Sequence, residues 1–486
     1  MDMREELTHW LTGRRWYAGK GREIAHLDVS GIGLLGETPP VELIAVNVTY
    51  ADAEHETYHV PVSYRAEPDP ALAHALIGHW SREGGTPQYA YDALEDKEAT
   101  TAWLTGMTSG RYANGLSFQR EASDTPLPTH EPSRVLGGEQ SNTSLVFGDA
   151  VILKVFRRLT AGTNPDVELL HALAQAGNTS VPALLGWVDG SWPGPGDSPD
   201  SSPDSSPNQA LNTGTVAIAT EFFPSATDGW DLALASVRAL YAEDDPDPAA
   251  SGGDFAGEAF RLGQATASVH ADLARVLGSV SWSGPDIKDL ALTLQARLEA
   301  AVTAAPQLSP FADEIGARYA ELMSHEPTLT AQRVHGDLHL GQALRTDSGW
   351  RILDFEGEPA RPVTERSAPQ TPLKDVAGML RSFDYAARQL FSGADPTAAA
   401  RPGAEERAAA WAARNQRAYC AGYADVAGAD ALTDPIALIA LVLDKAAYEV
   451  VYETRNRPEW IDVPLGAIRR LLATPVLGDV LAGGRS

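Results

Sequence analysis

Cysteine and positive charge are both scarce in this sequence of 486 residues. The single cysteine, Cys420, excludes an internal disulfide, which is typical of proteins in a reducing compartment. Lys and Arg number 38 against 65 Asp and Glu, which gives a net charge of −27. Because binding to nucleic acid requires cations that neutralise phosphates, this balance argues against a nucleic-acid partner.

Long hydrophobic runs are missing as well. The longest, near Ile436 to Leu443, is far too short to span a bilayer. The first six residues are mostly charged or polar and lack the apolar stretch of a signal peptide. We therefore expect a cytoplasmic protein with no membrane partner. The composition, 43% hydrophobic and 21% charged, is that of a globular protein, and the length favours two or three packed units.

The hydrophobic pattern changes along the chain. The spacing of apolar residues predicts helices at 70–110 and from about residue 228 onward. The exception in the second region is a turn-rich segment at 333–372. β-Branched and aromatic residues predict a meander of strands over 22–65, with further strands and one helix after residue 130. The predicted strands are 41–48, 55–65, 134–136, 144–147, 151–156, 184–188 and 215–220, and the helix is 166–176. A β-rich first half followed by a helical second half predicts an α+β, two-lobed protein-kinase-like fold.

One tract has low complexity. Residues 189–213 are rich in Gly, Pro, Ser and Asp, and cannot bury enough apolar surface to order themselves. Because strands are predicted on both sides of the tract, we interpret it as the tip of a hairpin. The alternative is a linker between domains.

A glycine pattern near the amino terminus resembles a dinucleotide-binding motif. Gly31, Gly33 and Gly36 have the required spacing, but that motif needs a helix to follow. Pro39 and Pro40 oppose such a helix. We interpret the segment as a hairpin turn.

The strongest chemical signal is the segment 334–342, Val-His-Gly-Asp-Leu-His-Leu-Gly-Gln, followed by Asp354-Phe355-Glu356. Phosphoryl transfer requires a carboxylate that orients and deprotonates the attacking hydroxyl, and oxygen ligands that hold Mg²⁺ against the phosphates. Asp337 fits the first task, and Gln342 and Asp354 fit the second. An isolated His-Gly-Asp would more often cap a turn, but the Asp-Phe-Glu that follows favours phosphoryl transfer.

Two histidines lie in the same segment. His335 and His339 could suggest a metal site, but Mg²⁺ prefers oxygen ligands, so we interpret both as structural. His339 and Asp337 are also candidates for contact with the acceptor, the substrate that receives the phosphate. The segment resembles the catalytic loop of the aminoglycoside-phosphotransferase-like kinases, in which Asn is more usual at the position of Gln342.

A candidate nucleotide site lies upstream. Small residues between two predicted strands would let backbone N–H groups approach phosphates, and the candidates are Gly137, Gly138, Gln140, Ser141, Asn142 and Ser144. Lys154 follows in an apolar strand, where a lysine needs a charged partner, and Glu168 on the next helix could provide it. Lys154 would then also bind the α- and β-phosphates of ATP. The alternative is an edge-strand lysine that reaches into solvent.

The segment 220–224, Thr-Glu-Phe-Phe-Pro, ends the last strand before the helical half. Its position makes the backbone around Glu221 and Phe223 the candidate contact for adenine. This assignment rests on position alone.

Several segments resemble the maltokinase family over nearly the whole chain. They are 14–22, 335–342, 354–359, 372–385, 444–453 and 455–460. The resemblance implies an N-terminal cap subdomain at 1–90, a nucleotide-binding subdomain at 91–224, and a helical lobe at 225–486 with the catalytic loop and sugar site. It also implies transfer from ATP, with Mg²⁺, to the anomeric hydroxyl of maltose. Maltose 1-phosphate would feed α-glucan (glycogen) synthesis, with trehalose synthase as a functional neighbour.

The last of these segments carries a candidate sugar-binding face. Lys445, Tyr448 and Tyr452 are spaced i, i+3 and i+7, so a helix would place them on one side. Polar and aromatic groups on one face suit a sugar. The neighbouring candidates for the acceptor site are Glu449, Arg455 and Trp460. The alternative is a tyrosine stripe in the core with a Lys445–Glu449 pair on the surface.

Two other functions remain open. The first is a glucosamine or aminoglycoside kinase on the same fold, although residues 445–460 are neutral and aromatic rather than densely acidic. The second is a pseudokinase that binds nucleotide or sugar as a regulator. Lys154, Asp337, Gln342 and Asp354 are all present and argue against it.

Overall fold

The structure is a computed structural model. It describes residues 2–37, 39–81, 85–110, 112–113, 115–123, 125–137, 141–195, 211–242, 247–250, 253–325, 328–358, 361–389, 403–428 and 434–473. The chain forms two compact units, one of Met1–His171 with Pro182–Pro224 and one of Ala172–Val181 with Ser225–Ser486. In the described part, no helix combines the length and apolar character needed to cross a membrane. The further division of the first unit at residue 90 stays a prediction.

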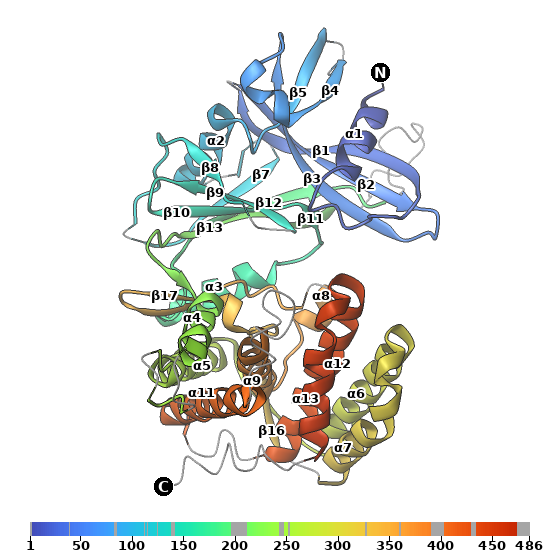
Figure 1. The fold of residues 1–486 in the computed structure, drawn as a ribbon. Helices are drawn as coiled ribbons and strands as arrows, with labels where there is room; N and C mark the ends of the chain where they lie inside the picture. Colours follow the sequence, from blue (N-terminus) through green and yellow to red (C-terminus); the bar gives the residue numbers. More distant parts are fainter. Residues whose placement is uncertain are drawn as a thin grey trace. The chain divides into compact units, whose positions relative to one another are not determined.

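Two antiparallel sheets build the first unit (Figure 1). The first has the order β1-β2-β3-β5-β4, with β11 paired to β3. Its strands are β1 Ile24–Glu37, β2 Pro40–Tyr50, β3 His55–Arg65, β4 Leu76–Ser81, β5 Pro87–Asp92 and β11 Arg158–Leu159. The second has the order β6-β7-β12-β13-β10-β9-β8. Its strands are β6 Tyr112–Ala113, β7 Leu116–Arg120, β8 Ser133–Val135, β9 Asn142–Phe147, β10 Val151–Phe156, β12 Leu184–Trp192 and β13 Asn212–Glu221.

The first sheet is buried on both faces, as strand β2 shows. Leu43 and Ala45 belong to a core cluster shared with the second sheet and with Trp103 of helix α2 (Lys97–Ser109). Ile44 and Val46 belong to a second cluster, which contains residues of helix α1 (Met3–Thr12). Because neighbouring strand residues point to opposite faces, a nearly continuous apolar run marks a strand covered on both sides.

The predicted strands of the first unit are confirmed, with two corrections. Residues 76–81 and 87–92, predicted as helix, form β4 and β5, while 70–75 form the short helix η1 (Pro70–Ala75). The glycine segment 31–36 lies within β1 and contains two register shifts. The turn therefore comes after it, where Glu37 pairs with Pro40, and a strand follows rather than a helix.

The tract at 189–213 joins paired strands. β12 and β13 run antiparallel from Leu184 with Thr220 to Trp192 with Asn212, so the tract connects the two arms of a hairpin, as predicted. The interpretation as a linker between domains is therefore wrong. Residues 196–210 lie outside the described part of the chain.

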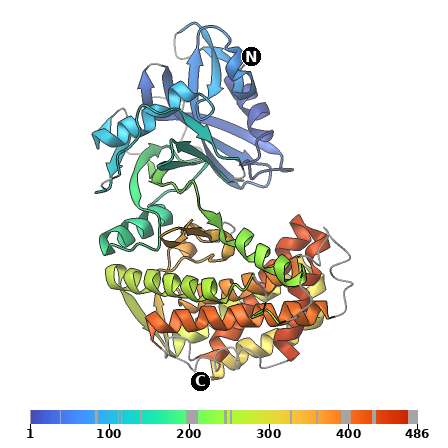
Figure 2. The ribbon, with the colours of Figure 1, turned by 60° about the vertical axis from the view of Figure 1, so that its left-hand side comes forward.

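The second unit is mainly helical, as predicted (Figure 2). Its helices are α4 Gly229–Ala242, α5 Ala256–Leu277, α6 Pro285–Ala304, η2 Pro306–Phe311, α7 Ala312–His325, η3 Leu340–Gln342, α8 Val363–Arg366, α9 Leu373–Arg388, α11 Ala404–Ala427, α12 Pro435–Asn456, η6 Pro458–Trp460 and α13 Asp462–Ala473. Helix α3 (Pro165–Ala176) passes from the first unit into the second. The short strands are β14 Thr227–Asp228, β15 Ser279–Trp282, β16 Leu329–Gln332, β17 Ala343–Thr346 and β18 Gly349–Ile352.

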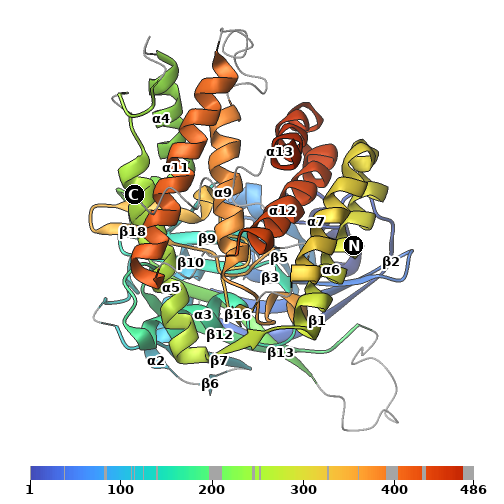
Figure 3. The same ribbon diagram turned by 90° about the horizontal axis from the view of Figure 1, so that it is seen from below.

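Helix α9 forms the centre of the second unit. Nearly all of its residues are buried, and it packs against α11 and α12 (Figure 3). Long helices α5 and α11 run side by side. The backbone oxygens of Phe260 and Tyr419 lie where side chains at Gly422 and Gly263 would begin, so glycine permits this close approach. The segment 333–339 leaves β16 and leads into η3 beside α9.

Candidate active site

The segment 333–339 is held in place by a buried carboxylate on α9. Asp375 accepts hydrogen bonds from the backbone N–H groups of His335 (2.8 Å, to Oδ2) and Gly336 (2.8 Å, to Oδ1). The imidazole of His270, from α5, lies 2.9 Å from the same Oδ2. Burial alone would raise the pKa of Asp375, but the hydrogen bond and charge of His270 make it lower than usual. Asp375 thus fixes the backbone on which Asp337 stands.

His335 is structural, in agreement with the sequence-based interpretation. Its Nε2 donates to the carbonyl oxygen of Leu353 (2.7 Å), and its Nδ1 accepts from the backbone N–H of Asp337 (3.3 Å). These two bonds use Nε2 as a donor and Nδ1 as an acceptor, and so fix the orientation of the ring. The ring also packs on Phe355, with centroids 4.9 Å apart. His335 therefore links the loop of Asp337 to the loop of Asp354.

His339 is the capping residue before η3, and its Nδ1 accepts a hydrogen bond from the backbone N–H of Gly341 (3.1 Å). Burial is the main cause that lowers its pKa to about 4. His339 is therefore a neutral side chain next to the candidate base, and its contact with an acceptor stays a prediction.

The two predicted metal ligands lie next to each other. The side-chain Nε2 of Gln342 donates to Oδ2 of Asp354 (3.1 Å). The backbone N–H of Leu353 donates to the main-chain carbonyl oxygen of Gln342 (2.9 Å). Asp354 has a left-handed backbone conformation (φ 62°), which is unusual for a residue with a side chain and is often found at functional sites. A carboxylate beside a side-chain amide is a donor set that fits Mg²⁺.

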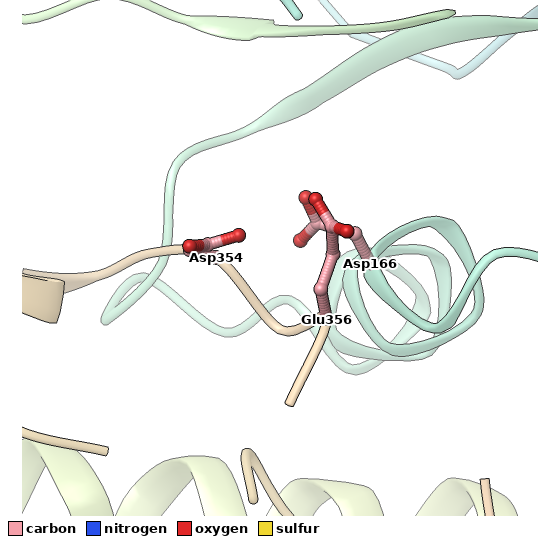
Figure 4. Close-up of side chains that lie close together, drawn as sticks. All are labelled: Asp166, Asp354 and Glu356. Carbon is pink, nitrogen blue, oxygen red and sulfur yellow. The ribbon is translucent and has the colours of Figure 1, made fainter. Parts of the chain in front are cut away.

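A third oxygen donor in this loop was not given a role in the sequence analysis. Glu356 follows Asp354 by two residues, and carboxylate oxygens of the two lie within 4.8 Å of each other. Figure 4 draws both side chains on the loop that follows β18. The acidic spacing Asp-Phe-Glu was the signal that could have identified it.

Asp337 lines a cavity of about 530 Å³ within the second unit. Lys445 from α12 lines the same cavity, as do residues of α6 such as Asp289 and Arg297. The lining carries more carboxylates than cations. The carboxylates are Asp286, Asp289, Asp337, Glu358, Glu365 and Asp444, and the cations are Arg297, Lys374 and Lys445. The sequence did not predict this acidic lining, because all six carboxylates come from positions outside 445–460.

Lys445, Tyr448 and Tyr452 all lie on helix α12, so their spacing places them on one side of it, while their contact with an acceptor stays a prediction. Lys445 and Tyr448 are half-buried and Tyr452 is exposed, so the three do not form a core stripe. Lys445 pairs with Asp337 and Glu358, with its Nζ 4.8 Å from the centre of the Tyr448 ring. The alternative of a buried tyrosine stripe with a Lys445–Glu449 surface pair is therefore wrong.

The remaining acceptor candidates have other surroundings. Glu449 Oε2 accepts two hydrogen bonds from Arg381 (3.0 and 2.6 Å). Trp460 stacks on Tyr385, with centroids 6.2 Å apart. Arg455 is exposed on α12. The cavity that contains Asp337 is not lined by these three residues, nor by Tyr448 or Tyr452.

The predicted nucleotide-binding residues all belong to the first unit. Lys154 lies on β10, between β13 and β9, so it is not on an edge strand and that alternative is wrong. Its Nζ lies 3.5 Å from Oδ2 of Asp166, a buried carboxylate in the first turn of α3. Glu168, the predicted partner, lies in the same turn. The sequence pattern predicts this helix, but not the pairing of Lys154 with Asp166.

The glycine-containing loop lies between β8 and β9, as predicted. Gly137 and Ser141 flank Gly138 and Gln140, which lie outside the described residues. Asn142 and Ser144 are buried within β9. Ser144 pairs with Lys154 in the neighbouring strand.

The candidate adenine contact follows β13. The backbone N–H of Glu221 donates to the carbonyl oxygen of Ala183 (3.0 Å), and that of Phe222 donates to the carbonyl oxygen of Ala150 (2.9 Å). Both N–H groups are therefore already used in hydrogen bonds within the protein. Phe223 follows directly. A contact between this segment and adenine stays a prediction.

Comparison with known proteins supports the kinase assignment. The maltokinase N-terminal cap domain family matches residues 10–96. The glucosamine kinase of Streptacidiphilus jiangxiensis is 31% identical over 418 residues, which cover 82% of this chain and 81% of that protein. The glucosamine kinase of Mycolicibacterium smegmatis is 27% identical over 431 residues, or 84% and 94% of the two chains.

A solved glucosamine kinase, in complex with glucosamine, ADP and inorganic phosphate, has the same fold. It aligns with a TM-score of 0.64 and 23% identity over 97% of this chain and 99% of that one. The α+β, kinase-like fold with a cap is thereby confirmed. The chain belongs to the family of ATP-dependent sugar kinases that includes the glucosamine kinase of Streptacidiphilus jiangxiensis, and its own N-terminal region matches the maltokinase cap domain.

Proposed function

We propose that this kinase phosphorylates a hydroxyl of an amino sugar of the glucosamine class. The observation that carries the proposal is the acidic lining of the cavity that contains Asp337. Asp286 and Asp289 line this cavity from α6, and Asp286 also accepts a hydrogen bond from the backbone N–H of Ser283. Carboxylates in a cleft attract a cationic acceptor and would disfavour a neutral one of similar size. Two relatives that align with most of the chain are glucosamine kinases.

Asp337 would act as the base. Its carboxylate would accept the proton of the acceptor hydroxyl while the hydroxyl oxygen forms a bond to the γ-phosphorus of ATP. The bond from that phosphorus to the β,γ-bridging oxygen breaks, and ADP leaves with the electron pair. Since the transition state of phosphoryl transfer is loose, the chain contributes mainly by positioning the reactants.

The nucleotide would be held by Lys154 and the loop between β8 and β9. The ammonium group of Lys154, paired with buried Asp166, is suited to phosphate oxygens. Gln342 and Asp354 would hold Mg²⁺, with Glu356 as a further oxygen donor. When bound, Mg²⁺ would neutralise negative charge on the phosphates.

Maltose is the second candidate acceptor. The match of residues 10–96 to the maltokinase cap domain favours it, as do the segments of the chain that resemble maltokinases. Transfer to the anomeric hydroxyl would then give maltose 1-phosphate, and trehalose synthase would be the expected functional neighbour.

The test is a set of kinetic constants with Mg-ATP and four acceptors: glucosamine, N-acetylglucosamine, glucose and maltose. The proposal predicts the highest kcat/KM for glucosamine and a loss of about 10²-fold or more on N-acetylation, which removes the positive charge. Asp289→Asn should reduce this discrimination. A higher kcat/KM for maltose would overturn the amino-sugar assignment, and no transfer to any sugar would favour the pseudokinase alternative.

A further inference from the structure

Lys445 joins two loops of the candidate active site. Its Nζ lies 2.7 Å from Oδ1 of Asp337 and 3.1 Å from Oε1 of Glu358. Asp337 belongs to the segment between β16 and η3, and Glu358 to the loop that also carries Asp354. One ammonium group thus contacts the loop of the candidate base and the loop of a candidate metal ligand.

Charge keeps this bridge in place. Burial alone would lower the pKa of Lys445, but the carboxylates of Asp337 and Glu358 outweigh it and leave the pKa well above the usual value. Glu358 is only 4% exposed, and its other oxygen accepts a hydrogen bond from Arg361 (2.9 Å). Burial alone would raise the pKa of Glu358, but Lys445 and other nearby cations hold it well below its usual value. Lys445 is therefore a charged hydrogen-bond donor, and the buried carboxylate of Glu358 holds it in place.

The contact with Asp337 is specific in its geometry. Among the described residues, Lys445 is the one hydrogen-bond donor to the Asp337 side chain, and it contacts Oδ1 only. The second carboxylate oxygen, Oδ2, is left for another partner. The ammonium group also lies over the ring of Tyr448, 4.8 Å from its centre.

We infer that Lys445 is a positioning residue for phosphoryl transfer: it fixes the Asp337 carboxylate so that Oδ2 meets the acceptor hydroxyl. This inference rests on the proposed role of Asp337 as the base. Because the transition state of phosphoryl transfer is loose, the protein contributes mainly by positioning the reacting groups. A displacement of about 1 Å at such a group can reduce the rate by about 10²-fold.

The role differs from that of a sugar ligand. If Lys445 served mainly to bind the acceptor, its loss would raise KM and leave kcat nearly unchanged. A positioning residue acts on kcat, because its contribution is made in the transition state. A purely structural ion pair would change stability and impair both substrates together.

The test compares Lys445→Met with Lys445→Arg under saturating Mg-ATP and glucosamine. Lys445→Met should lower kcat by about 10²-fold while the KM for the sugar changes less than about threefold. Lys445→Arg can still donate to both carboxylates and should stay within about tenfold of the wild type. Lys288→Met, which removes an exposed lysine of α6 outside the cavity lining, should leave kcat unchanged.

Folding is controlled by a second variant. Removing Lys445 alone leaves the buried carboxylate of Glu358 with less positive charge beside it, which could destabilise the fold. The double variant Lys445→Met/Glu358→Gln removes both charges and so avoids this effect. It should show the same loss of kcat with a melting temperature close to that of the wild type. A raised KM with normal kcat in either variant, or loss of kcat only in proportion to loss of folded protein, would overturn the inference.

The turnover of Asp337→Asn, measured in the same experiment, separates the positioning role of Lys445 from the role of Asp337 as the base. If Asp337→Asn loses turnover and Lys445→Met does not, only the positioning role fails. If Asp337→Asn retains turnover, the assignment of the base fails as well.

Discussion

Asp375 and His270 lie 2.9 Å apart in the interior of the helical unit, between Oδ2 and Nε2. The other nitrogen of His270 lies 2.9 Å from the hydroxyl of Tyr423. A chain of polar groups therefore extends from α11 through α5 to α9. It ends at the backbone of His335 and Gly336, next to the candidate base.

The first prediction follows from this arrangement. In Asp375→Asn, an amide replaces a carboxylate that accepts two backbone N–H bonds, so one of these bonds is lost and the loop of Asp337 moves. We expect the free energy of unfolding to fall by about 1–3 kcal/mol and kcat to fall by at least about tenfold. Thermal unfolding and steady-state kinetics measure the two effects. A stable variant with normal kcat would show that Asp375 does not fix the loop.

The second prediction concerns the ring of Tyr448. Tyr448→Ala should raise the KM for the sugar, with a loss of kcat/KM of up to about a hundredfold, and leave the KM for ATP nearly unchanged. Tyr448→Phe, which keeps the ring, separates the contribution of the hydroxyl. A folded Tyr448→Ala enzyme with wild-type sugar kinetics would remove this residue from the acceptor site.

Helix α12 shows how much the sequence could predict. The spacing of Lys445, Tyr448 and Tyr452 was sufficient to place them on one face, because it follows from the helical repeat. The partners of Lys445 lie 108 and 87 residues away, and no local period gives such pairings. The acidic lining was missed for the same reason, since it is assembled from several separate segments.

Strands β4 and β5 show a limit of local propensity. Residues 76–92 contain Ala, Leu and Trp at spacings that suit a helix, but β5 pairs with β3 and β4 in the first sheet. Pairing and burial of Tyr91 override the weak helical preference. By contrast, the apolar strand of Lys154 was identified correctly, because a buried strand leaves a strong signal.

The third prediction is that residues 196–210 are dispensable. β12 and β13 are paired as far as Trp192 with Asn212, so a short Gly-Ser connection beyond this pair can close the hairpin. Since loop-closure entropy depends weakly on length, the melting temperature should change by only a few degrees and both KM values should stay the same. Loss of nucleotide or sugar binding in the shortened protein would assign the tract to a site.

The fourth prediction is a pH dependence of stability. His59 is fully buried, its Nδ1 donates to the carbonyl oxygen of Phe156 (3.1 Å), and burial is the main cause that lowers its pKa to about 3. Below its usual pKa of about 6.5, the unfolded chain binds a proton that the folded chain excludes until near pH 3. Stability should therefore fall as the pH decreases from about 6.5 to 3.

The matched variant for this effect is His59→Asn, whose side-chain amide can still donate to Phe156. The free energy of unfolding of this variant, measured in urea between pH 7 and 4, should depend less steeply on pH than that of the wild type. The difference between the two slopes should correspond to at most one proton taken up on unfolding. Equal slopes in the two proteins would contradict the assignment of a neutral, buried His59.

The most direct test of the account as a whole is the turnover of glucosamine by Asp337→Asn, measured together with nucleotide affinity. Asn can accept a hydrogen bond from the sugar hydroxyl but is a poor proton acceptor. We therefore expect kcat to fall by about 10²–10⁴-fold, with the Kd for ATP nearly unchanged. Near-normal turnover in a folded Asp337→Asn variant would contradict the account, because the phosphoryl transfer would then not depend on the residue around which the site is built.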